Sequence, residues 1–110
     1  MPTIQEQFKI NENIIRIPLP GEKLAQNVND LNVINQYGSE LYKKNKDFIR
    51  ENVPDTWFAA IEPTSGTFVA SNQPIKLYEY TSTEFPGKLI YVIGLLRDHT
   101  INFIFDYGER

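Results

Sequence analysis

The chain has 110 residues, of which 41% are hydrophobic and 23% are charged, and its net charge is −3. This length and composition are those of one small globular domain that buries its own core. The acidic balance argues against a general nucleic-acid binder, which normally carries a basic face. The absence of cysteine excludes disulfides and thiolate metal sites.

The apolar runs of the chain are short. The longest, Leu89 to Leu96, has the length of a strand and falls far below the roughly 20 residues of a membrane span. Residues 1–7 lack the basic and apolar regions of a signal peptide. We therefore expect a soluble, cytoplasmic protein with no membrane association.

Residues 1–25 carry alternating apolar side chains that are interrupted at Asn11–Asn13. This pattern predicts a hairpin that turns at the interruption, or an edge strand over Ile14–Ile17. Pro18 would end that strand, because proline cannot donate to a β-ladder.

Residues 28–52 are predicted to be helical, with Asn27 or Asn29 as the N-cap. The apolar stripe follows steps of three and four residues: Leu31, Ile34, Tyr37 or Gly38, Leu41, Asn45 and Phe48. Gly38 either lies inside one helix, at a cost of about 1 kcal/mol relative to alanine, or separates two helices. The lysines at 43, 44 and 46 are interpreted as a solvated helix face.

Residues 57–107 predict two β-hairpins joined by a short helix. The first hairpin turns at Pro63–Gly66, where glycine suits a left-handed conformation. Its strands have no consistently polar face, so we expect both faces to be covered in part. A helix over 74–84 starts at Pro74 and ends at Pro86–Gly87. The second hairpin pairs Leu89–Leu96, an expected central strand, with Thr100–Phe105.

These elements predict an α+β fold with a single domain over 1–110. The core is a four-stranded, largely antiparallel sheet of ββαββ order, and the N-terminal helical segment packs on one face. We expect the helix at 74–84 to pack on that same face, through a stripe of Ile75, Tyr78, Ser82 and Phe85.

Recognisable catalytic motifs are absent from the sequence. The chain contains no phosphate-binding, dinucleotide-binding or zinc-hydrolase signature, so no catalytic residue, cofactor or metal ligand is assigned. His99, the single histidine, lies in a short connection and is interpreted as a turn residue. If a small-ligand or enzymatic pocket exists between sheet and helices, Tyr78, His99 and Asp106 are its candidates.

Aromatic side chains are numerous in the predicted sheet. Stacking on single-stranded RNA would need lysine and arginine on the same face, and the strands carry these only at their ends. Packing in the core is the simpler interpretation. Aromatic residues left on the surface would mark a protein interface, for which the candidates are Trp57, Phe58, Phe68 and Tyr91.

One stretch of the chain resembles a group of small uncharacterised bacterial proteins. It consists of Phe58-Ala-Ala-Ile-Glu-Pro-Thr-Ser-Gly66, then Pro74 and Tyr78, then Phe85-Pro-Gly-Lys-Leu-Ile-Tyr91. The group has the pattern Phe-Val-Ala-Ile-Glu-Pro-x-Ser-Gly, a short helix, and Tyr-Pro-x-Lys-Leu-Phe-Tyr. The resemblance covers about half of the chain and departs from the group's pattern after Tyr91. It implies a companion or regulatory protein, in some members antitoxin-like, and carries over no catalytic residues.

The leading hypothesis is therefore a non-enzymatic module that binds another protein, with a homodimer as the expected form. The alternatives are the small-ligand or enzymatic pocket and an antitoxin-like protein that binds nucleic acid. The last rests on Asn13–Pro18, which is similar to the strand of swapped-hairpin DNA-binding antitoxins, although the net charge disfavours it.

Overall fold

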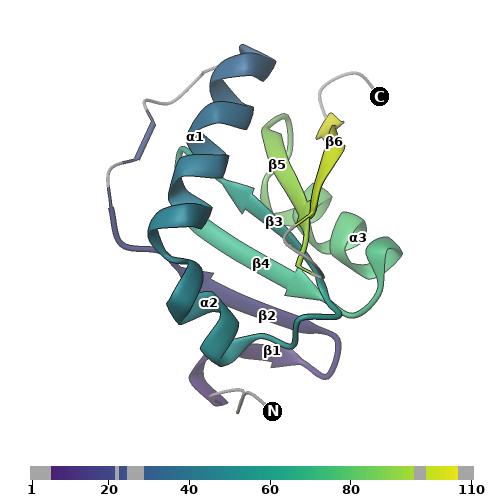
Figure 1. Cartoon of the computed structure of the whole chain (residues 1–110). Coiled ribbons are helices and arrows are strands. Elements are labelled where there is room, and N and C mark those ends of the chain that lie inside the picture. The colour runs from purple at the N-terminus through teal and green to yellow at the C-terminus, as the bar shows by residue number, and fades with distance from the viewer. Residues whose placement is uncertain (1–5, 22, 25–28, 96–98, 107–110) are drawn as a thin grey trace.

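The computed structural model describes residues 6–21, 23–24 and 29–95, and the backbone of 99–106 (Figure 1). The strands are β1 (Lys9–Asn11), β2 (Ile14–Pro18), β3 (Phe58–Glu62), β4 (Thr67–Ser71), β5 (Leu89–Gly94) and β6 (His99–Asp106). The helices are α1 (Leu31–Lys44), α2 (Lys46–Asn52) and α3 (Pro74–Glu84), and a 3-10 helix at Glu6–Phe8 precedes β1. None of the helices in these residues is long and apolar enough to cross a membrane.

The described strands form one antiparallel sheet in the order β1-β2-β4-β3-β5-β6. The prediction of an α+β fold with an antiparallel sheet is confirmed, and the ββαββ order of β3, β4, α3, β5 and β6 is present. The prediction of four strands is wrong, because β1 and β2 extend the sheet beyond β4. As expected, β5 is an internal strand with both faces buried.

The N-terminal segment completes the sheet through a hairpin. The backbone N–H of Asn13 donates to Asn11 Oδ1 at 2.8 Å, which closes the turn between β1 and β2. Ile15 pairs with Ala70 of β4 and is 1% exposed. The predicted turn at Asn11–Asn13 is therefore confirmed, and β2 is the second strand from the edge.

The turn between β3 and β4 has the predicted left-handed glycine. Gly66 has a φ of +69°, and its N–H donates to the carbonyl of Glu62 at 2.9 Å. A β-carbon at this φ would be strained, so the turn depends on glycine.

Helix α1 begins at a different cap from the predicted one. The carboxylate of Asp30 accepts the backbone N–H groups of Asn32 at 2.9 Å and Val33 at 3.4 Å. The assignment of Asn27 or Asn29 as the cap is therefore wrong. The helical segment is interrupted at Asn45, whose side-chain amide donates to the carbonyl of Leu41 at 2.9 Å.

Gly38 lies inside α1 because the helix approaches the sheet closely there. A β-carbon added at Gly38 would lie against Tyr91 Cβ and within 2.5 Å of Tyr91 Cγ on β5. The glycine therefore permits a contact that any larger residue would obstruct, and the alternative of two helices separated at Gly38 is wrong. Helix α1 lies over β5 and β3 (Figure 1).

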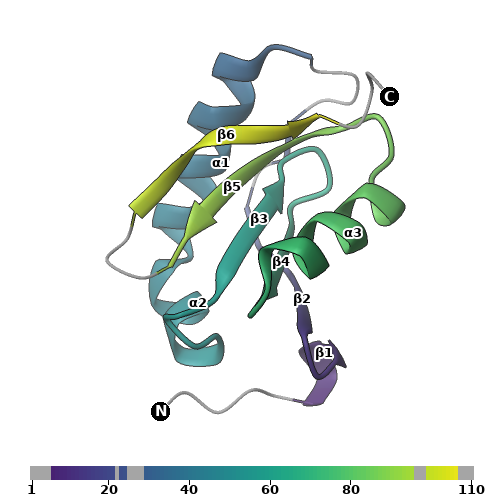
Figure 2. The ribbon, with the colours of Figure 1, turned by 90° about the vertical axis from the view of Figure 1, so that its right-hand side faces the viewer.

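The helices cover both faces of the sheet (Figure 2). The α1 side contains one core cluster, to which Ile34, Ile49 and Ile61 belong, and the α3 side contains a second, to which Leu77 and Ile90 belong. The expectation that both helical segments pack on one face is wrong. Since strand side chains alternate between faces, the apolar residues on both faces of β3 and β4 have separate helical partners.

The stripe predicted for α3 also differs from the buried one. Leu77 and Thr81 are buried against the sheet, whereas Ile75 is 68% exposed and Tyr78 is 37% exposed. Buried residues four positions apart are one helical turn apart, so the face that contacts the sheet is rotated from the predicted one. The predicted bounds of this helix are confirmed.

Replacing Gly38 by alanine should lower the free energy of unfolding by about 2 kcal/mol, because the added methyl group overpacks the contact with Tyr91. Chemical denaturation measures this change. The control is Gln36→Ala at an exposed position of the same helix, which should change stability by less than about 0.5 kcal/mol. A stabilised Gly38→Ala variant, as expected for an exposed helical glycine, would contradict the close contact.

Candidate functional site

Two of the four candidate interface residues are part of the core. Phe68 is 0% exposed and Tyr91 is 2% exposed, and both belong to the cluster between the sheet and α1. Neither side chain is accessible to a partner in this chain. Packing between the sheet and α1 accounts for these two aromatic residues.

Trp57 and Phe58 are half-buried at the start of β3. Trp57 packs against the α1-side cluster and Phe58 against the α3-side cluster. The carbonyl of Trp57 accepts the N–H of Leu95 at 3.2 Å, which ties this point to the end of β5. Their role in an interface stays a prediction.

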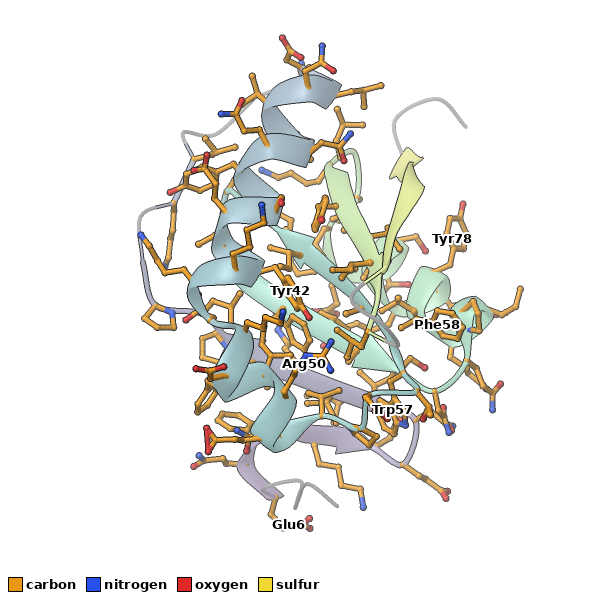
Figure 3. The ribbon with its side chains drawn as sticks, in the orientation of Figure 1. Glu6, Tyr42, Arg50, Trp57, Phe58 and Tyr78 are labelled. Carbon is orange, nitrogen blue, oxygen red and sulfur yellow. The ribbon has the colours of Figure 1, made fainter. Side chains whose placement is uncertain are left out.

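The side chain of Tyr78 extends from α3 and is 37% exposed (Figure 3). With Ile75, three residues earlier, it forms an exposed apolar stretch one turn long. We call Ile75 and Tyr78 the α3 surface. It is rotated around the helix from the face that carries the buried Leu77 and Thr81.

His99 and Asp106 are the two end residues of β6. His99 pairs with Gly94 and Asp106 with Leu89, and the side chains of both lie outside the described residues. Seven residue steps separate them, which corresponds to roughly 20 Å along a strand. The backbone therefore does not bring these two candidates together at one pocket.

A surface hollow of about 330 Å³ lies against α1, and its described lining is Tyr37, Glu40, Leu41, Lys43 and Lys44. Tyr78, His99 and Asp106 are not among these residues. The exposure of Lys43 and Lys44 confirms the prediction of a solvated helix face at these two positions. In the described part of the chain, no group of three or more His, Cys, Asp or Glu residues could hold a metal ion.

Glu62 is a buried carboxylate that sequence reasoning did not single out. It is 2% exposed at the end of β3. It accepts the backbone N–H groups of Thr64 at 2.9 Å and Ser65 at 3.0 Å, together with the Thr64 hydroxyl. Lys88 donates to that hydroxyl at 3.2 Å from the start of β5. In the Glu-Pro-Thr-Ser-Gly stretch, the Glu62 carboxylate thus caps the turn that follows it. The position of Glu62 directly before the predicted turn was the sequence signal for this role.

Arg16 joins the N-terminal strand to α3. Its guanidinium donates to Glu84 Oε1 at 2.6 Å and to the Tyr80 hydroxyl at 2.9 Å, and it lies 5.3 Å from the centre of the Phe85 ring. The hydrogen bond to Tyr80 raises the pKa of Arg16, Glu84 adds to this effect, and burial opposes it. The cluster therefore holds a permanent cation in a structural contact between two elements that are distant in sequence.

The two edges of the sheet differ in length and composition. At one edge, β1 has three residues, all exposed, and begins with Lys9. At the other edge, β6 has eight residues, and Thr100–Phe105 contains no charge and no proline. None of the described strands pairs with β6 on the side away from β5. An edge strand of this length with an uncharged middle section offers unpaired backbone groups to another strand.

Comparison of the chain with protein-family models, with curated proteins and with solved structures finds no match.

Replacing Glu62 by alanine should lower the free energy of unfolding by about 2–3 kcal/mol, because two backbone N–H groups of the turn would lose their acceptor. Thermal and chemical denaturation measure this loss. Glu12→Ala, in the exposed turn between β1 and β2, is the matched control and should cost less than about 0.5 kcal/mol. A Glu62→Ala variant as stable as the control would refute the structural role of this carboxylate.

Proposed function

We propose that this protein is a non-enzymatic interaction module that binds another protein and forms a homodimer. The observation that carries the proposal is the edge strand β6, whose middle section Thr100–Phe105 is uncharged and which pairs with no described strand on its outer side. The two faces of the sheet are already covered. Backbone groups at such an edge bind an extended segment of another chain without any dedicated catalytic group.

The polar side chains in the interior support a binding role over a chemical one. Glu62 caps a turn, and Asn45 and Asn52 donate to helix carbonyls at 2.9 Å and 2.8 Å. Arg16 links β2 to α3. Each of these groups is used to hold the fold together, so none of them is poised at a cavity where a substrate could react.

The α3 surface adds exposed apolar area to the described part of the molecule. Ile75 is 68% exposed, although isoleucine is among the residues most often buried. Half-buried Phe58 packs against the core cluster on the α3 side. Single exposed apolar residues are ordinary, but two that lie three positions apart on one helix are compatible with a protein contact. This supports an interaction role without defining the partner.

The alternatives have less support. Tyr78 is not among the described lining residues of the hollow against α1, and the side chains of His99 and Asp106 lie outside the described residues. The segment with similarity to antitoxin strands, Asn13–Pro18, is paired inside the sheet as β2, and Ile14, Ile15 and Ile17 are buried in the core. Neither observation favours a ligand site or a nucleic-acid surface over a protein contact.

The chain should have a solution mass of twice its 12.8 kDa in light scattering after size exclusion. Because association follows mass action, the dimer fraction should fall on dilution from about 200 μM to about 10 μM. A solution mass of one chain at every concentration would contradict the proposed homodimer.

A further inference from the structure

We infer that two copies of this chain associate through β6, which pairs antiparallel with β6 of the second copy to form one continuous sheet of twelve strands, twice the six of one chain. This inference rests on the proposed homodimer and assigns its interface. It is carried by the length of β6, by its composition and by the contrast with the opposite edge.

The length of β6 gives the contact enough backbone to pair. Its eight residues extend over roughly 25 Å. In an antiparallel strand, alternate residues direct their N–H and C=O groups to each side, so about half of the β6 residues direct these groups away from β5. Such groups are satisfied by water or by another strand.

The composition of β6 lacks the devices that protect an edge. Natural edge strands are commonly blocked by lysine, by proline or by short length, and Thr100–Phe105 has none of these. Threonine, isoleucine and phenylalanine are also residues that favour pleated, paired strands. These residue types are therefore suited to pairing. The register of β6 against β5 shifts between Thr100 and Ile104, so the regular segments of β6 lie on either side of this shift.

Electrostatics favours this edge over other parts of the surface. Each chain carries a net charge of −3, so two copies repel each other as they approach. A contact through six uncharged residues places no like charges opposite each other in its middle section. The two charge-bearing ends of β6 lie at the rim of the contact, where solvent screens them.

Two-fold symmetry indicates that a second copy of this chain binds at the β6 edge and that the assembly contains two chains. An antiparallel pair of identical strands is related by a two-fold axis, which satisfies both open edges in one contact. Growth into a filament would need β6 to pair with the opposite edge. That edge is the three-residue β1, which begins with Lys9, so a head-to-tail contact is disfavoured by its short length and its charge.

The test introduces a lysine at each edge of the sheet. Asn102→Lys introduces a charge into β6, and Ile10→Lys introduces one at an exposed position of β1. We expect Asn102→Lys to weaken dimerisation at least tenfold in light scattering and Ile10→Lys to leave it unchanged. Circular dichroism checks that both variants are folded. A folded Asn102→Lys variant that dimerises like the unmodified chain would overturn the assignment while leaving the homodimer intact.

A second variant decides the question if Asn102→Lys does not fold. The chain has no cysteine, so one introduced cysteine can form a disulfide only between two copies. A two-fold axis at the middle of β6 sets either Asn102 or Phe103 opposite its own copy, with β-carbons about 5 Å apart. Under mild oxidation, Asn102→Cys or Phe103→Cys should form a cross-linked dimer, and Ile10→Cys at the exposed β1 edge should not. Failure of both β6 cysteines to cross-link a chain that is dimeric by mass would refute the β6 contact, whereas a chain that is monomeric by mass would refute the homodimer itself.

Discussion

The close approach of α1 to β5 at Gly38 is the constraint on which the rest of the structure depends. Because residue 38 has no side chain, the helix lies directly against Tyr91, and Phe68 and Ile61 fill the same layer. This places α1 over the centre of the sheet and leaves α3 to cover the opposite face. Two covered faces explain why both sets of alternating residues in β3 and β4 are buried, without any contribution from a partner chain.

Covering both faces limits where this protein can bind. The core aromatics are enclosed, the carboxylate of Glu62 is used by its own turn, and Arg16 is used to attach α3 to β2. Exposed apolar side chains of the described residues lie on α3 (Ile75 and Tyr78), and also at Ile10 on β1, Leu31 and Val33 on α1, and Phe48 on α2. The outer edge of β6 adds backbone groups that no described strand pairs. The sheet edges are unequal: three exposed residues protect one edge, and eight residues without a central charge leave the other open. This inequality favours a closed dimer over extended aggregation.

The sequence predicted those features that depend on local chemistry. The left-handed Gly66, Pro74 at the start of α3 and the break at Asn11–Asn13 each follow from the conformational preferences of one or two residues. Features set by distant contacts were not predictable. The role of Gly38 depends on Tyr91, more than 50 positions away in the chain. The buried stripe of α3 was misassigned because Ile75 and Tyr78 are apolar but face outward, whereas the polar Thr81 is buried and donates its hydroxyl to the carbonyl of Leu77 at 2.9 Å.

Amide hydrogen exchange of β6 as a function of protein concentration tests the central claim most directly, because it reports the backbone groups that the proposed contact would pair. We expect the amides of Thr100–Phe105 to exchange more slowly as the dimer fraction rises, while those of β1 exchange at a constant rate. Exchange in β6 that is independent of concentration, in a sample whose mass changes from monomer to dimer, would contradict the account.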